Sequence, residues 1–211
     1  MITWHPQTDD FGQRVILHSP SKPSPLSTWS DANAVATAVP GQSMPDTIPH
    51  GTWQGPEGND WEVLAGTMPF KEPLAAQQVM WSAGALVLEG DGRVWLITPS
   101  NRFGGYDYTF PKGKQELGCS LKSTALKEVW EESGLKVQLT AWLGDFPRTT
   151  STCRMYLATR VSGNPADMGW ESQAVHLVPE AKLNELLLPI DQSIISVWRE
   201  WKTPFDTDLF I

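Results

Sequence analysis

Three glutamates crowded on one face of a short predicted helix restrict this chain more than any other feature. Ser120 is a good N-terminal cap and Gly134 suits the left-handed position that ends a helix, so a helix is predicted over residues 120–133. Spacings of three and four residues put three carboxylates on one face of it, at Glu128, Glu131 and Glu132. Like charges at these spacings repel each other, so a compensating partner is expected. A hard divalent cation, Mg²⁺ or Mn²⁺, prefers such oxygen ligands and commonly binds phosphate at the same time.

The loop before this helix also indicates phosphate chemistry. Pro111-Lys112-Gly113-Lys114 follows a short predicted strand and combines a flexible glycine with two lysines. Backbone N–H groups in such a loop, together with the positive charge, can bind a phosphate. The loop and the helix together predict a site for a cation and a small phosphorylated molecule.

The residues from Gly113 to Leu135 resemble the Nudix box, whose usual form is G-x5-E-x7-R-E-U-x-E-E-x-G-U, with U an aliphatic residue. The spacing of the glycines and all three helix glutamates agree with that form. Two positions depart from it, because Cys119 stands where the family has glutamate and Lys127 where it has arginine. In the family these two residues usually form a salt bridge that holds the loop against the helix. Glu116 is our candidate for the replacement partner of Lys127.

The resemblance implies roles for the residues of the box. Glu128 and Glu132 would be direct metal ligands, Glu131 a ligand or the group that activates water, and the carbonyl of Gly113 a further ligand. The bound Mg²⁺ or Mn²⁺ would neutralise charge on phosphate oxygens and lower the pKa of a water that attacks one phosphorus of a diphosphate. Some members take the general base from a loop outside the box. The candidates for that base here are Glu171 and Asp167.

The sequence at 111–113 bears on the substrate. Its Pro-Lys-Gly form is similar to that of Nudix hydrolases of dinucleoside polyphosphates and diphosphoinositol polyphosphates, whereas ADP-ribose hydrolases more often have Pro-Ala-Gly or Pro-Gly-Gly. A lysine beside the metal suits a long phosphate chain, because its ammonium can pair with oxygens that the metal does not reach. Aromatic side chains on nearby loops can hold a base by stacking. The candidate substrate-binding residues are Arg102, Phe103, Tyr106, Lys112 and Lys114.

The pattern of strands and helices in residues 78–211 predicts an α+β domain. Asp-Gly at 91–92 lies between apolar runs at 79–89 and 94–98, which indicates a β-hairpin. Further strands are predicted at 108–110, 137–142, 150–161 and 175–178, and helices at 179–187 and 190–201. This order fits an α/β/α sandwich with a mixed sheet, which is the fold that the Nudix resemblance implies.

Residues 1–77 differ in composition and are predicted to form a Pro- and Trp-rich N-terminal extension. They hold ten of the 17 prolines and four tryptophans, namely Trp4, Trp29, Trp53 and Trp61. A disordered segment is normally poor in aromatic residues, so the extension is expected to pack. A strand is predicted at 15–17, and a short helix from residue 30 or 31 through 38. The extension is interpreted as an arm over the domain, with an element for dimerisation or for covering the substrate as the alternative.

Composition excludes several classes of partner. Sixteen basic residues against 24 acidic ones give a net charge of −8, which argues against binding to duplex nucleic acid. The sequence has no run of about 18 apolar residues and no basic, apolar leader at its start, so a cytoplasmic protein without a membrane span is expected. The two cysteines, Cys119 and Cys153, lack the spacing of a disulfide framework or a zinc site. A homodimer is compatible with all of this.

The leading hypothesis is a metal-dependent hydrolase that cleaves a diphosphate linkage in a nucleotide or dinucleoside polyphosphate. The alternative is a Nudix-fold nucleotide-binding or regulatory module that has lost turnover through the changes at Cys119 and Lys127. A third interpretation treats the glutamates as a solvated helix face, but it leaves the matching positions of Gly113 and Gly134 unexplained. His176 lies in an apolar predicted strand and is interpreted as a core histidine.

Overall fold

A computed structural model describes residues 2–44, 55–56, 60–77 and 79–202 of the 211-residue chain. Within these ranges no helix has the length and apolar character needed to cross a membrane. Trp53, one of the tryptophans expected to pack, lies outside them.

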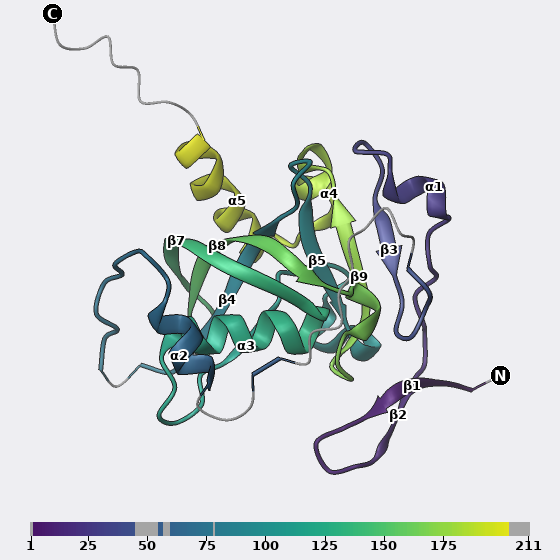
Figure 1. The fold of residues 1–211 in the computed structure, drawn as a ribbon, viewed down its shortest axis with the longest axis horizontal. Helices are drawn as coiled ribbons and strands as arrows, with labels where there is room; N and C mark the ends of the chain where they lie inside the picture. Colours follow the sequence, from purple (N-terminus) through teal and green to yellow (C-terminus); the bar gives the residue numbers. More distant parts are fainter. Residues whose placement is uncertain (1, 45–54, 57–59, 78, 203–211) are drawn as a thin grey trace, which may run out of the picture.

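A seven-stranded mixed sheet forms the centre of the molecule (Figure 1). Its strand order is β3-β9-β5-β4-β8-β7, and β6 pairs with β4 beside this path. The central strands β4 and β8 run parallel to each other, whereas the other paired strands are antiparallel. The strands are β3 (Ala36–Ala38), β4 (Trp81–Leu88), β5 (Val94–Pro99), β6 (Lys112–Lys114), β7 (Leu135–Pro147), β8 (Thr152–Gly163) and β9 (Ser172–Val178).

The hairpin predicted around residues 91–92 joins β4 to β5. Gly92 has φ +86°, a left-handed conformation that glycine adopts without strain. Most residues of β4 are buried, because helices cover both faces of the sheet and the strand is central.

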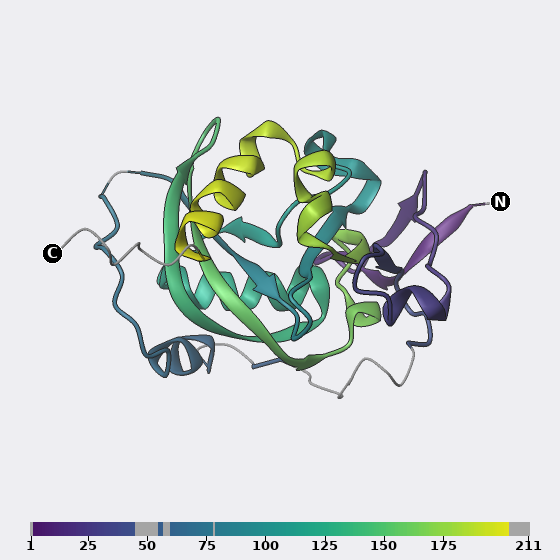
Figure 2. The ribbon, with the colours of Figure 1, turned by 90° about the horizontal axis from the view of Figure 1, so that it is seen from above.

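Helices lie on both faces of the sheet, as Figures 1 and 2 show. On one face lies α3 (Leu121–Ser133), and on the other lie α4 (Leu183–Leu186) and α5 (Pro189–Lys202). Each face has its own core cluster: Val129 packs in the α3 cluster, and Trp198 in the cluster beneath α5. The predicted α+β sandwich with a mixed sheet is confirmed.

Some predicted elements differ in detail. The helix expected at 179–187 is a 3₁₀ turn (Glu180–Lys182) followed by the single turn α4. The strand expected at 108–110 is reduced to one bridge, between Thr109 and Ile97. Conversely, β6 was expected as loop, and it becomes a strand because it pairs with β4.

The described residues of the N-terminal region form a hairpin, two short helices and an edge strand. They are β1 (Thr3–Thr8), β2 (Arg14–Leu17), α1 (Leu26–Trp29), β3 and α2 (Asp60–Gly66). The strand predicted at 15–17 is confirmed within β2, but the helix predicted through residue 38 is wrong. Residues 36–38 instead extend the central sheet as β3, because the edge of β9 offers them backbone partners. The first region therefore supplies a strand to the sheet of the second.

Candidate active site

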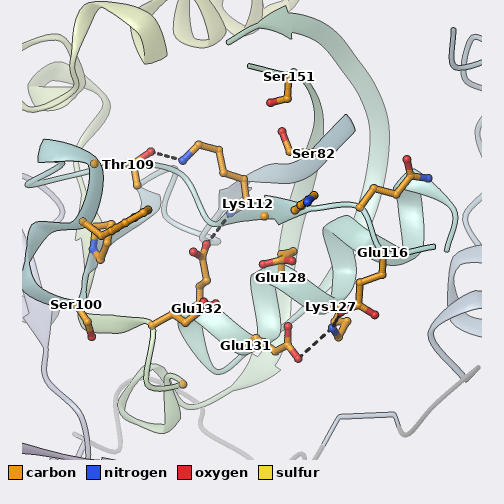
Figure 3. Close-up of a pocket in the computed structure, with 18 of the residues that line it drawn as sticks. Ser82, Ser100, Thr109, Lys112, Glu116, Lys127, Glu128, Glu131, Glu132 and Ser151 are labelled. Atoms are coloured by element: carbon orange, nitrogen blue, oxygen red, sulfur yellow. Dashed lines mark hydrogen bonds and ion pairs between the residues drawn. The ribbon is translucent and has the colours of Figure 1, made fainter. Parts of the chain in front are cut away.

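Three carboxylates from two segments that are distant in the sequence meet in one cavity. Glu128 and Glu132 lie one turn apart on α3, and Glu171 lies in the turn that precedes β9. Each offers an oxygen, and these three oxygens all lie within 4.8 Å of one another. Figure 3 shows Glu128 and Glu132 directed from the helix toward the Lys112 segment.

The carboxylates are strongly destabilised as anions. Burial, followed by the charges of Glu132, Glu131 and Glu171, raises the pKa of Glu128 to about 9. Burial likewise raises the pKa of Glu132 to about 8, although Lys112 opposes the rise. The pKa of Glu171 is also raised, mainly by burial and then by the charge of Asp10. A bound divalent cation would offset this repulsion, and the oxygen-only donor set fits Mg²⁺ or Mn²⁺.

The strand β6 is placed directly against the glutamate face of α3. The backbone N–H of Lys112 donates a hydrogen bond of 2.6 Å to Oε2 of Glu132. At Gly113 a Cβ atom would lie only 2.1 Å from Oε2 of Glu128, so no larger residue fits without a shift. The glycine of the loop is therefore required by the close approach of the backbone to this carboxylate.

The ion pair hypothesised for Lys127 is confirmed. Its Nζ pairs with Glu116 of the loop and lies 3.5 Å from Oε1 of Glu131 on the next turn. Glu116 thus makes the connection between loop and helix for which the family uses the position of Cys119.

The N-terminal end of α3 is bound by its serine cap and also by a glutamate that the sequence did not indicate. Ser120 caps the helix through its side chain, as predicted, and accepts a 3.2 Å bond from the N–H of Ser123. Glu62 of α2 accepts a 2.5 Å bond from the N–H of Ser120 and a further bond from the hydroxyl of Ser123. A carboxylate at this end also interacts favourably with the helix dipole.

The cavity has a volume of about 2150 Å³ and contains most of the predicted site residues. Phe103, Tyr106, Lys112, Lys114 and all three helix glutamates line it, together with Asp167 and Glu171. Phe103 is 83% exposed, at the rim. The ammonium of Lys112 lies 5.1 Å from the ring centre of Tyr106.

Arg102 is placed differently from its expected role. It forms an ion pair with Asp107 in the same loop, it is more than half exposed, and it is not among the residues that line the cavity. Asp167 lines the cavity without belonging to the carboxylate trio, and its Oδ1 accepts a 3.2 Å bond from Asn164.

The structure places a positively charged side chain in the cavity that the sequence did not indicate. Arg148, in the turn after β7, lines the cavity and bonds through Nη1 to the fully buried Asp191, at 2.7 Å. Asp191 also accepts a 2.7 Å bond from the hydroxyl of Thr109, which in turn accepts a 2.8 Å bond from the ammonium of Lys112. Arg148 therefore pairs directly with this buried carboxylate, and Lys112 is linked to it through the hydroxyl of Thr109.

One edge of the Arg148 guanidinium is unsatisfied. Among the described residues, Nε and Nη2 have no hydrogen-bond partner although both are buried. The thiol of Cys153 is a neighbour of Arg148. Burial raises the pKa of this thiol and keeps it neutral, and a neutral thiol is only a weak hydrogen-bond acceptor for the guanidinium. The hydroxyls of Ser82 and Ser151 lie on the side of Lys112 away from Glu128 and Glu132 (Figure 3). Only the tertiary structure brings this turn, β4 and α5 together, so no spacing in the sequence could have indicated the arrangement.

His176 is a core histidine, as interpreted. Its Nδ1 and Nε2 lie 2.9 Å and 2.8 Å from the hydroxyls of Thr37 and Thr98. Complete burial lowers its pKa to about 3, so the ring is neutral near pH 7.

The comparisons with known proteins identify the family to which this part of the chain belongs. A family model described as "NUDIX domain" matches residues 79–199. A relative from Mycobacterium tuberculosis, named "Putative mutator protein MutT4", is 34% identical over 125 residues, which are 53% of this chain and 50% of that protein. The chain thus spans half the length of this curated relative.

Two solved structures show the same fold. One is a NUDIX hydrolase from Nitrosomonas europaea, with a TM-score of 0.50 and 19% identity, over 59% of this chain and 91% of the other. The second is an ADP-ribose pyrophosphatase from Streptococcus suis, with a TM-score of 0.50 and 16% identity, over 61% and 96% of the two chains. The family match covers more than half of the sequence, and it includes the helix and loop whose glutamates and glycine meet in the cavity. The chain belongs to the Nudix family.

Proposed function

We propose that this protein hydrolyses a diphosphate linkage in a nucleotide or dinucleoside polyphosphate, with Mg²⁺ or Mn²⁺ as the cofactor. The observation that carries the proposal is the carboxylate trio of Glu128, Glu132 and Glu171, whose oxygens lie within 4.8 Å of one another beside Lys112. Residues 78–211 would form the catalytic domain, and residues 1–77 an extension.

The residues of the cavity divide the work of the reaction. Glu128, Glu132 and Glu171 would hold the cation, with the carbonyl of Gly113 as a further ligand. When bound, the cation supplies charge neutralisation at the phosphate oxygens and a more acidic water. Glu131 lies outside the trio and is held by Lys127, so it is our candidate for accepting the proton of the attacking water. Glu171 is the alternative base, since it is the trio member that comes from a loop.

The charge distribution in the cavity favours a substrate with several phosphates. Lys112 and Arg148 both line it, next to hydroxyl groups. Their two positive charges outweigh the single negative charge of Asp191 that lies between them. Phosphate oxygens beyond the cleaved bond would bind there. Phe103 and Tyr106 also line the cavity, with the Tyr106 ring beside Lys112, and a base could stack on them. This distribution supports a dinucleoside polyphosphate or a nucleoside triphosphate over a substrate with a single diphosphate.

The experiment is phosphate release from a substrate panel with Mg²⁺ or Mn²⁺, for the natural protein and for Glu132→Gln. The panel contains diadenosine polyphosphates, nucleoside triphosphates, ADP-ribose and a diphosphoinositol phosphate. The matched control is Glu185→Gln, since Glu185 is an exposed glutamate on α4 outside the cavity. Turnover of one class that is lost only in Glu132→Gln supports the proposal. No turnover, with metal binding intact, would instead favour the nucleotide-binding module.

A further inference from the structure

The turn over residues 167–171, which carries Glu171, contacts a part of the chain outside the family match. The side chain of Gln7 in β1 donates hydrogen bonds of 3.3 Å and 3.2 Å to the carbonyls of Asp167 and Met168. The carboxylate of Asp10, in the turn of the same hairpin, accepts a 3.1 Å bond from the indole N–H of Trp170. Both ends of the 167–171 turn are therefore held by the β1–β2 hairpin.

The same turn is fixed from within the domain by its backbone. Ser100 donates through its hydroxyl to the carbonyl of Trp170 and through its N–H to the carbonyl of Glu171, both at 2.6 Å. The N–H of Gly169 donates a 2.6 Å bond to the carbonyl of Glu131. A Cβ at Gly169 would lie 2.5 Å from that carbonyl oxygen, so the turn packs directly on the end of α3. A small displacement of the turn would consequently move Glu171 relative to Glu128.

The hairpin is anchored firmly enough to act as a support. The side chain of Asn101 accepts a 2.8 Å bond from the N–H of His18 and donates a 2.8 Å bond to the carbonyl of Ile16. Asn101 has φ +55°, which asparagine tolerates better than most residues. Gln173, two residues after Glu171, donates a 3.0 Å bond to the carbonyl of Ser19. These contacts tie the hairpin and the chain just after it to both segments that flank the cavity.

The hairpin also faces the cavity directly. Its lining residues are Gln7, Thr8, Asp10 and Val15. They lie with Asn101, Phe103 and Trp170 in the wall, whereas the cations Lys112 and Arg148 come from other segments.

We propose that the N-terminal hairpin is a structural part of the active site, in which Gln7 and Asp10 are positioning residues for Glu171. They act by holding the 167–171 turn against α3, so that the third carboxylate stays within reach of Glu128 and Glu132. The inference rests on the proposed function for its catalytic consequence, but the geometric part stands on the contacts alone. Family membership does not assign this role, because the family match begins at residue 79.

The test uses the full chain with Gln7→Ala and Asp10→Ala. Both residues are exposed, so the variants are expected to fold. The matched control is Gln13→Ala on the same hairpin, because the Gln13 side chain is exposed and bonds to nothing within the described part of the chain. Two properties are measured on each protein: hydrogen exchange of the peptide that covers residues 167–172 in the metal-free state, and the Kd for Mn²⁺.

We expect faster exchange of that peptide and a Kd for Mn²⁺ raised about fivefold in each variant, which is the typical effect of one lost hydrogen bond. The control should match the natural protein in both measurements. Trp170→Phe removes only the N–H donor, so the combination Asp10→Ala with Trp170→Phe should weaken Mn²⁺ binding no further than either change alone.

A lowered melting temperature with unchanged exchange at 167–172 and unchanged Mn²⁺ affinity would overturn the inference, because the hairpin would then only stabilise the fold. Identical behaviour of Gln7→Ala and Gln13→Ala would overturn it as well. If the natural protein hydrolyses no member of the panel while Gln7→Ala still alters exchange and Mn²⁺ binding, the positioning role is supported and the proposed hydrolysis fails.

Discussion

The backbone N–H of Lys112 donates a 2.6 Å hydrogen bond to one carboxylate oxygen of Glu132. This bond occupies Oε2 and fixes the rotation of the side chain, so the other oxygen can face the remaining glutamates. It also sets the register between β6 and α3, which brings the Lys112 ammonium and the carboxylates into the same cavity. One backbone bond thus links the Lys112 segment to the carboxylates of α3.

Glu128→Gln should raise the melting temperature of the metal-free protein and reduce its stabilisation by Mg²⁺. The raised pKa of Glu128 destabilises the folded state, because its carboxyl must either take up a proton or hold a charge that Glu132, Glu131 and Glu171 repel, and glutamine avoids both. Metal binding to the native state alone raises stability by mass action. Thermal denaturation in EDTA and in Mg²⁺ measures both effects. An equal Mg²⁺-dependent shift in Glu128→Gln and the natural protein would show that the cation binds elsewhere.

Cys119→Glu, which restores the usual family residue, should not increase stability by itself. Lys127 already has Glu116 and Glu131 as partners, and a new carboxylate would lie near both Glu116 and Glu62. Combining Cys119→Glu with Glu116→Gln removes the excess negative charge and should recover stability, within the roughly 1 kcal/mol that an exposed ion pair contributes. The midpoints of urea unfolding of the two single variants and of the double variant test this prediction. A Cys119→Glu single that is more stable than the natural protein would contradict it.

Arg148→Lys should raise KM for a polyphosphate substrate about tenfold with a smaller change in kcat. A lysine can still neutralise Asp191, but it lacks the Nε and Nη2 edge that is unsatisfied in the structure. The control is Arg160→Lys, which likewise alters a buried arginine in an ion pair, here with Glu89, but lies outside the cavity lining. Equal KM values in both variants would remove Arg148 from the substrate site.

The stability of the protein should fall on acidification below pH 6.5 because of His176. Burial lowers the pKa of the folded-state ring from 6.5 to about 3. Between these values the unfolded chain binds a proton that the folded chain excludes, so stability decreases as the pH falls. The single group accounts for about 2 kcal/mol between pH 7 and pH 5.

Urea unfolding at the two pH values, in EDTA, compares the natural protein with His176→Gln. The variant should lose about 2 kcal/mol less than the natural protein over this interval, because glutamine does not titrate. The two threonine hydroxyls suit the neutral ring. The hydroxyl of Thr98 donates to the carbonyl of Asp107 and therefore accepts from Nε2–H of His176, while the hydroxyl of Thr37 donates to Nδ1. Equal losses in both proteins would mean that His176 does not titrate across folding.

The sequence by itself determined the local features of the site. The helix with its cap at Ser120 and its left-handed end at Gly134, and the shared face of the three glutamates, depend on residues that are close along the chain. Helix periodicity and capping chemistry fix such relationships without reference to the rest of the fold. The mixed sheet with helices on both faces also follows, since its order of strands and helices is visible in the apolar pattern.

Only the tertiary structure decided which distant residues complete the site. Arg148 reaches the cavity because the end of β7 pairs with the start of β8, which lies beside the start of β4. Glu171 reaches it because the start of β9 pairs with the end of β5, and the N-terminal hairpin because it bonds to the 167–171 turn. Arg102 shows the opposite outcome. It was a candidate for substrate binding by its place in the sequence, but its side chain pairs with Asp107, and neither residue lines the cavity. The physical reason is that sheet order and layer packing set contacts between segments far apart in the chain, whereas propensity and spacing act over only a few residues.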